Sequence, residues 1–197
     1  MSKGPRYRVQ FRRKREGKTN YYKRLGMIRS GKPILVLRGS LKHFRVQIVK
    51  PEMKGDIILA SAWSQELTKK LGWRGYTGNV PSAYLTGLLC GGRAVKRGVT
   101  EVVPNIGFHV ACKESRVFAA IKGVIDAGVK VPCSEEMLPT EERIRGEHIA
   151  RYAEMMLKEG EGQYYKRFSG YLSSGLRPEG LPEHFKEVKE KIMRSDA

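Results

Sequence analysis

The basic residues of this 197-residue chain are concentrated at one end. The first 50 positions contain sixteen lysines and arginines and a single acid, Glu16. The remaining positions hold 22 bases and 19 acids, so nearly all of the net charge of +18 lies in the first quarter. Charge of this density is not buried, and it repels itself unless a polyanion neutralises it. The fold must therefore leave this segment on the surface, facing nucleic acid or an acidic membrane.

Several classes of protein do not fit the sequence. It has no apolar run near the ~20 residues that span a bilayer. Residues 1–15 are basic with no hydrophobic segment behind them, so we expect no secretory signal, although a transit peptide stays open. Cys90, Cys112 and Cys133 are odd in number and widely spaced, unlike a disulfide framework or a metal site. We therefore expect a protein of the reducing cytoplasm.

Aromatic residues alternate with the bases of the first segment. They are Tyr7, Phe11, Tyr21, Tyr22 and Phe44. In RNA binding, cations contact phosphates while aromatic and guanidinium planes stack on unpaired bases. The alternative is a solvated basic tail whose tyrosines pack on the core, and Tyr21, Leu25 and Ile28 do fit one helix face.

The rest of the chain predicts an α/β fold. The expected elements are a short helix at 19–30 capped by Thr19, strands at 34–38, 43–50 and 57–62, helices at 64–71 and 81–97 with Ser64 capping the first, a strand at 99–103 ended by Pro104, and a helix at 115–127. In the strand at 43–50, Phe44, Val46 and Ile48 alternate with Arg45 and Gln47, which indicates one buried and one exposed face. The βββαβα order predicts a mixed sheet packed by helices.

The composition changes after Pro132, where charge-mixed amphipathic helices are expected at 140–158, 163–173 and 182–193. We expect three regions: a basic N-terminal arm and short helix at 1–31, an α/β RNA-binding core at 32–132, and a helical C-terminal extension at 133–197. Residues 1–17 are expected to be extended and to become ordered on the partner.

One candidate anion site lies at the start of a predicted helix, where Lys113, Ser115 and Arg116 surround free backbone N–H groups. The alternative is an ordinary helix cap with two solvated cations. Residues 17–19 resemble the end of a phosphate-binding P-loop, but Arg12 stands where that motif needs glycine, and we reject it.

No motif predicts catalysis, a metal or a cofactor. The four histidines lack ligand spacing. Gly87, Gly91 and Gly92 around Cys90 are better explained by close helix–sheet packing than by a cofactor loop. Acidic residues near position 140 are interpreted as favourable charges at a helix start. We expect a chain that is not an enzyme and has no small-molecule substrate.

Several stretches resemble a known family. They are Gly4-Pro5-Arg6-Tyr7, Arg12-Arg13-Lys14-Arg15-Glu16-Gly17-Lys18-Thr19-Asn20-Tyr21, Lys32-Pro33-Ile34-Leu35-Val36, Tyr76-Thr77-Gly78-Asn79, Ala83-Tyr84-Leu85-Thr86-Gly87, Ser115-Arg116-Val117-Phe118-Ala119-Ala120 and Gly146-Glu147-His148-Ile149. Together they resemble the universal eighteenth protein of the large ribosomal subunit in its archaeal form, over roughly the whole chain. The eukaryotic form is longer, and bacterial members lack such a tail.

The resemblance implies a structural protein of the large ribosomal subunit that binds 5S ribosomal RNA and anchors it to 23S ribosomal RNA in the central protuberance, beside neighbouring proteins that include a second 5S-binding protein. The contacts expected from the resemblance and from the exposed sheet face are Arg6, Tyr7, Arg8, Arg12, Arg13, Lys14, Arg15, Lys18, Asn20, Tyr21, Tyr22, Lys23, Arg24, Ser40, Lys42, His43, Arg45, Lys113, Ser115 and Arg116.

Two positions depart from the family pattern. The family usually has Asn in place of Leu41, which weakens the polar contact expected of the hairpin. It also tends to have Leu-Asp where this chain has Pro104-Asn105, so that loop is given no role. Two other functions stay open at this stage: an RNA-processing or RNA-modifying enzyme with the same basic surface, and a DNA-compacting chromatin protein.

Overall fold

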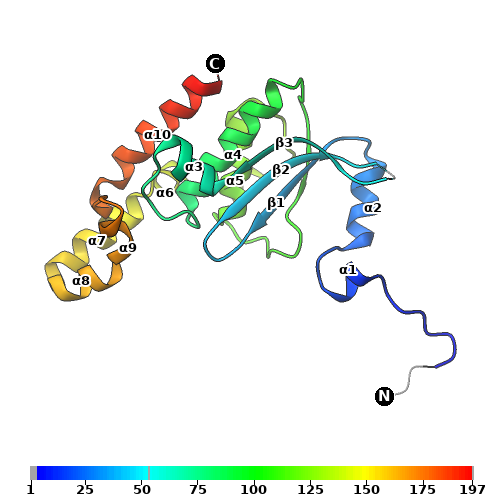
Figure 1. The fold of residues 1–197 in the computed structure, drawn as a ribbon, viewed down its shortest axis with the longest axis horizontal. Helices are drawn as coiled ribbons and strands as arrows, with labels where there is room; N and C mark the ends of the chain where they lie inside the picture. Colours follow the sequence, from blue (N-terminus) through cyan, green and yellow to red (C-terminus); the bar gives the residue numbers. More distant parts are fainter. Residues whose placement is uncertain (1–3, 53, 197) are drawn as a thin grey trace.

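A four-stranded sheet forms the centre of the computed structural model, which describes residues 4–52 and 54–196 (Figure 1). Its strands are β1 (Ile34–Gly39), β2 (Phe44–Lys50), β3 (Ile57–Trp63) and β4 (Val103–Asn105), in the spatial order β3-β2-β1-β4. β2 runs antiparallel to β1 and β3, whereas β4 runs parallel to β1. This mixed sheet, packed by helices and followed by a helical extension, confirms the predicted α/β class.

The alternation predicted for β2 decides which face of the sheet is covered. Phe44, Val46 and Ile48 are buried, whereas Arg45 is exposed. The buried face packs against α4 (Val80–Val95) and α5 (Arg116–Asp126), and α3 (Ser64–Leu71) follows directly on β3. The link from β3 to β4 therefore contains two helices, α3 and α4. The opposite face of the sheet, called here the outer face, carries Arg45.

Gly87 and Gly91 of α4 pack against α5 and the residue after it rather than against the sheet, which corrects the sequence interpretation. A Cβ atom at Gly87 would lie 2.1 Å from the backbone oxygen of Ala120 on α5. A Cβ atom at Gly123 would in turn lie 2.2 Å from the backbone oxygen of Tyr84. The two helices approach until their backbones touch, because neither carries a side chain at the crossing.

The fourth strand lies later than predicted. It includes Pro104, which was expected to end it, and pairs Leu35 with Pro104 in a parallel register. β4 is an edge strand, bonded only to β1, and an edge strand tolerates a residue without an N–H. Of the residues predicted as the strand, Val103 belongs to β4 and Glu101 forms an isolated bridge with Lys130.

Two predicted helix caps also differ. Ser64 is the first residue of α3 rather than its cap, and its buried hydroxyl accepts a hydrogen bond of 2.9 Å from the backbone N–H of Phe44. The cap of α2 (Tyr21–Arg29) is Asn20 instead of Thr19, since the Asn20 side chain accepts from the N–H of Lys23 at 3.1 Å. The arm before α2 also contains a short helix, α1 (Arg12–Arg15), where an extended chain was expected.

The C-terminal region contains more and shorter elements than predicted. They are η1 (Glu135–Met137), α6 (Glu141–Arg145), α7 (Glu147–Glu159), α8 (Glu161–Arg167), α9 (Ser169–Ser173), η2 (Pro178–Gly180) and α10 (Leu181–Asp196). The helix predicted at 140–158 is interrupted by Gly146, which has a left-handed φ of 84°. A Cβ atom there would lie 2.8 Å from the Leu181 side chain, so glycine lets α10 approach this break.

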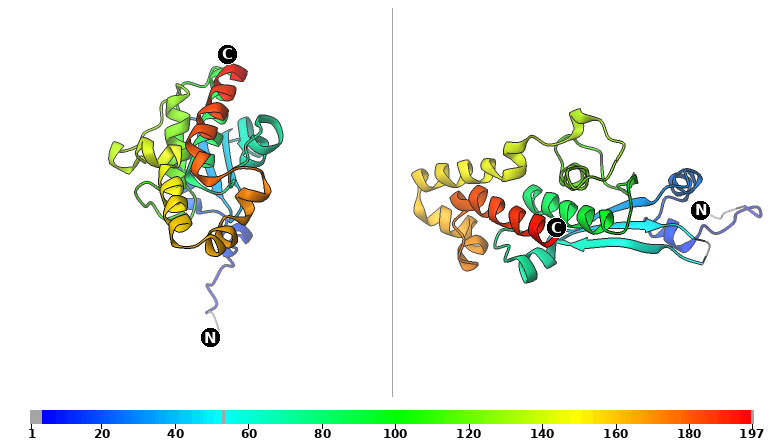
Figure 2. Two further views of the ribbon diagram at one scale, coloured as in Figure 1. Left: turned by 90° about the vertical axis from the view of Figure 1, so that its left-hand side faces the viewer. Right: turned by 90° about the horizontal axis from the view of Figure 1, so that it is seen from above.

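The final helix belongs to the main core. Leu181, Phe185, Val188 and Ile192 are buried in the same cluster as the sheet and α4. By contrast, α7, α8 and the residue before α9 form a second, smaller cluster. Figures 1 and 2 show that α7–α9 lie at one end of an elongated molecule and the N-terminal arm at the other. In the described part of the chain, no helix is long and apolar enough to cross a membrane.

Candidate nucleic-acid interface

The arm presents its bases to solvent. All four residues of α1 are exposed, as are Arg6 and Arg8 before it. Glu16 lies 2.8 Å from the Lys18 amine and 3.6 Å from Arg12. One carboxylate cannot neutralise this many cations, and surface ion pairs of this kind contribute little. The arm therefore keeps most of its positive charge available to a polyanion.

The helix that follows the arm is held by few apolar contacts. None of the nine residues of α2 is buried, and Tyr22 is 88% exposed. Tyr21 instead packs against Phe11 of the arm, with ring centroids 5.3 Å apart. An isolated helix of this length is marginal in water, so other contacts must hold it in place. Of the two predicted aromatics on α2, Tyr22 has its ring free to stack on a base.

An ion pair anchors α2 to the sheet. The Arg24 guanidinium donates two hydrogen bonds to the Asp56 carboxylate, one of 2.9 Å from Nη1 to Oδ2 and a second from Nη2 to Oδ1. Asp56 lies in the turn between β2 and β3, and the hydrogen bond to it raises the pKa of Arg24. Arg24 was predicted to contact RNA, which stays a prediction; in the structure its guanidinium positions the helix that carries its neighbours.

A basic cleft of about 270 Å³ lies between the arm, α2 and the outer face of the sheet. Its lining includes five bases, which are Arg13, Lys18, Lys23, Arg24 and Arg38, and one acid, Asp56. Burial, and then the nearby charge of Arg13, lowers the pKa of the half-buried Arg38. Because the one acid of the lining, Asp56, is already paired with Arg24, the cleft has the electrostatic character of an anion-binding site.

Two arginines face each other on the outer face. Arg38 of β1 is directly opposite Arg45 of β2 in the antiparallel register, and like charges in that position destabilise a sheet. Arg38 turns to the backbone oxygens of Leu37 and Asn105, at 2.7 and 2.9 Å. Arg45 lies over the Trp63 ring, 5.2 Å from its centroid. The two guanidinium groups thus turn apart, Arg38 toward β4 and Arg45 toward β3, which relieves the repulsion.

The β1–β2 hairpin is fixed by its own serine and by a distant loop. The Ser40 hydroxyl donates to the His43 carbonyl and accepts from the His43 N–H, both at 3.0 Å. Tyr76 donates from its hydroxyl to the Leu41 carbonyl at 2.6 Å, and Thr77 donates to the Lys42 carbonyl at 2.5 Å. Lys42 is left exposed at the tip. The predicted contact residue Ser40 therefore shapes the hairpin and is itself exposed.

The start of α5 lies beside this hairpin. Arg116 donates to the backbone oxygens of Ser40 and Gly78, at 3.2 and 2.8 Å, so its guanidinium joins three segments. The Ser115 hydroxyl is buried and has no hydrogen-bond partner in the described part of the chain. Lys113 lies 3.5 Å from Glu136 in an exposed ion pair. The anion site predicted here stays a prediction, and Arg116 has a positioning role that the sequence interpretation did not include.

Sequence reasoning missed Arg38, Tyr76 and Thr77 as site residues. Arg38 could have been found, because the antiparallel meander places it opposite Arg45 on the outer face. Tyr76 and Thr77 stand in a stretch that resembles the family, but local sequence does not show that they hold carbonyls 35 residues earlier in the chain.

The described residues contain no group of side chains suited to a metal ion. The sheet, the basic arm and the acid-poor cleft are features of a nucleic-acid-binding protein. A family model described as ribosomal large subunit proteins 60S L5 and 50S L18 matches residues 5–103.

Three relatives cover nearly the whole chain, and each is described as large ribosomal subunit protein uL18. The protein of Thermofilum pendens is 56% identical over 98% of this chain and 97% of its own length. Those of Staphylothermus marinus and Aeropyrum pernix are 53% and 52% identical, each over 98% of this chain, and over 96% and 90% of their own lengths. The chain belongs to this family of large-subunit ribosomal proteins. The matched descriptions are of ribosomal proteins rather than of enzymes.

Proposed function

We propose that this chain binds 5S ribosomal RNA and anchors it to 23S ribosomal RNA in the central protuberance, beside a second 5S-binding protein. The observation that carries the proposal is the continuity of basic surface from the arm, through the cleft, to the outer face of the sheet. Along this path the described residues contain two acids, Glu16 and Asp56, and both already bind bases.

Most of the predicted contact residues fall into two groups under this proposal. The exposed bases of the arm, together with Lys23, Lys42 and Arg45, contact phosphates, and Tyr22 stacks on an unpaired base. The second group gives the interface its shape: Asn20 caps α2, Arg24 anchors it, and Arg116 and Ser40 fix the hairpin. Preorganisation of this kind lowers the entropic cost of binding.

A gel-shift titration with 5S ribosomal RNA, with transfer RNA as competitor, tests the proposal across a salt series. If six phosphates are neutralised, raising salt from about 50 to 200 mM weakens binding on the order of a thousandfold. Tight binding that survives the competitor is expected. Equal affinity for both RNAs would leave only a general basic RNA binder.

Replacing two bases of the arm tests where the phosphates bind. Arg12→Ala combined with Arg13→Ala should weaken 5S binding and reduce the salt slope by about 1.5. A matched control is Lys158→Ala with Lys186→Ala, which removes the same charge from exposed sites on α7 and α10 that lie outside the proposed interface. If the arm variant keeps the full slope, the arm does not contact phosphate.

A further inference from the structure

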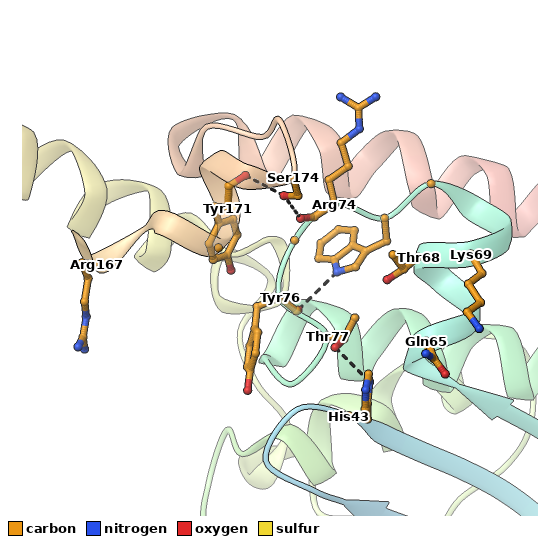
Figure 3. Close-up of a pocket in the computed structure, with 14 residues that line it drawn as sticks. His43, Gln65, Thr68, Lys69, Arg74, Tyr76, Thr77, Arg167, Tyr171 and Ser174 are labelled. Carbon is orange, nitrogen blue, oxygen red and sulfur yellow. Dashed lines mark hydrogen bonds between the residues drawn. The ribbon is translucent and has the colours of Figure 1, made fainter. Parts of the chain in front are cut away.

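A large open pocket lies where the C-terminal helices meet the core, away from the N-terminal arm. It is formed by α3, by the loop at 72–77 and by α8 and α9, and its volume is about 1210 Å³ (Figure 3). Small-molecule sites usually enclose roughly 300–1,000 Å³ and hide most of the ligand. This pocket is larger and open, so its dimensions suit a segment of a macromolecule better than a small molecule.

The charge of the pocket differs from that of its surroundings. Beyond residue 50 the chain is almost neutral, yet the lining contains the bases Lys69, Arg74 and Arg167 and no acid. Neighbouring bases such as Lys70 and Arg93 are paired with Glu66. Among the residues that the structure describes, the three lining bases form no ion pair, although acids are nearly as frequent as bases in this part of the sequence. The pocket is thus a local concentration of unneutralised positive charge.

Two of these bases stand on opposite sides of the pocket. In Figure 3, Lys69 on α3 and Arg167 on α8 lie to either side of Tyr76 and Thr77, whereas Arg74 extends away from them. Both side chains are exposed. An anionic chain that crosses the pocket from one to the other therefore passes the Tyr76 ring.

The loop that carries Tyr76 is rigidly supported. A Cβ atom at Gly75 would lie 2.6 Å from the buried Trp73 ring, so glycine alone lets the loop lie on the indole. His184 of α10 accepts a 3.1 Å hydrogen bond from the Arg74 N–H, and Ser174 donates to the Arg74 carbonyl at 2.7 Å. The C-terminal helices thus hold the loop from behind.

Tyr76 is presented at the surface by this loop. Its side chain is 46% exposed, and its hydroxyl is held by the Leu41 carbonyl. An aromatic ring fixed between two cations is the arrangement on which unpaired bases stack while flanking phosphates bind the charges. An acidic peptide would use the two cations but would not need the ring.

We propose that this pocket binds an unpaired segment of RNA, with one base stacked on Tyr76 and the flanking phosphates at Lys69 and Arg167. It is a second RNA contact, formed jointly by the core and the C-terminal helices. The inference does not depend on the identity of the RNA that the arm binds. His43 lines the pocket and lies next to the hairpin, so the new surface continues the interface described above.

Fluorescence anisotropy of the full chain with a labelled oligouridine decamer tests the charges. Lys69→Ala with Arg167→Ala should reduce the salt slope by about 1.4 and weaken binding roughly tenfold near 0.1 M salt, because two phosphate contacts are lost. The control variant, Lys158→Ala with Lys186→Ala, should leave the slope nearly unchanged. Equal losses in the two variants would mean that only general charge matters, and would overturn the proposal.

A matched pair of substitutions tests stacking. Tyr76→Phe and Tyr76→Leu both lose the hydroxyl that holds Leu41, but only phenylalanine keeps a ring. Tyr76→Leu should therefore bind the decamer about tenfold more weakly than Tyr76→Phe. In the wild-type chain, photo-crosslinking of 4-thiouridine in the decamer should map to Tyr76 or its neighbours. Equal affinity of the two variants would contradict stacking.

Two further outcomes keep this test separate from the proposed function. A polyglutamate peptide that displaces the decamer, and whose binding depends on Lys69 and Arg167 but not on the Tyr76 ring, would overturn the RNA proposal in favour of an acidic protein partner. The pocket variant is also measured with Arg12→Ala and Arg13→Ala present. If the chain binds 5S RNA no better than transfer RNA, the proposed function fails, but the effect of the pocket substitutions on decamer binding still decides this proposal.

Discussion

The ion pair between Arg24 and Asp56 should control RNA binding without contacting RNA. Removing the acid raises the net charge of +18 by one, so simple electrostatics predicts tighter RNA binding for Asp56→Ala. The structure predicts the opposite. Because none of the residues of α2 is buried, little else holds the helix against the sheet once this pair is removed. Its bases must then become ordered during binding, which costs entropy.

The geometry sets the magnitude of this effect. Both side chains are 29% exposed, and two parallel hydrogen bonds join them. Fully exposed pairs contribute about 0.2–1 kcal/mol, and bidentate charge-assisted pairs contribute more. We expect a coupling of about 1.5 kcal/mol, after allowance for solvent screening. If binding requires α2 in place, that corresponds to a loss of about tenfold in RNA affinity.

A double-mutant cycle measures the coupling. Arg24→Ala, Asp56→Ala and the double variant are compared by urea unfolding and by hydrogen exchange of the α2 amides, and each is titrated with 5S RNA. Lys23→Ala is the matched control, since it removes one exposed base from the same helix. A coupling below about 0.2 kcal/mol, or tighter RNA binding by Asp56→Ala, would refute the positioning role.

Two further predictions concern stability. Gly87→Ala forces a Cβ against the Ala120 carbonyl, so thermal unfolding should show that the free energy of unfolding falls by about 3 kcal/mol. The control is Gly26→Ala on α2, where a Cβ would meet nothing within 4 Å; it should be neutral or stabilising by up to about 1 kcal/mol. Equal effects of the two substitutions would contradict the α4–α5 contact. Burial, and then two nearby arginines, lowers the pKa of His109 below 6.5, and its neutral ring accepts from the Gly39 N–H at 3.1 Å. The unfolded chain therefore takes up this proton first, and the stability due to the neutral ring is full above about pH 6.5 and falls as pH drops below it. Urea unfolding between about pH 5 and 7 should show a steeper loss for the wild type than for His109→Gln, and identical slopes would contradict this assignment.

Some features of the interface followed directly from local sequence. The clustering of bases in the first 50 positions requires no tertiary information, because charge of that density stays at the surface in any fold. The alternation along β2 likewise places Arg45 on an exposed face, because side chains two residues apart in a strand share a face. The family resemblance then correctly indicated the large ribosomal subunit.

Other features depended on residues far apart in the chain. Local patterns assigned Ser64 to a cap, Pro104 to the end of a strand and Gly87 to a sheet contact. Tertiary neighbours decided each of these differently. Ser64 bonds to the first residue of β2, Pro104 lies within an edge strand beside β1, and Gly87 packs against the backbone of α5.

The sequence alone therefore determined the surface charge, the strand alternation and the helical character of the tail, because each depends on spacing within a few residues. Only the tertiary structure decided which cations are free. Arg24 and Arg116 look like any other arginine in the sequence, yet the carboxylate of Asp56 and the carbonyls of Ser40 and Gly78 occupy them. Lys69 and Arg167 lie on distant elements and border one pocket, where Ser174 and Tyr171 of the tail bond to Arg74 and Asn79.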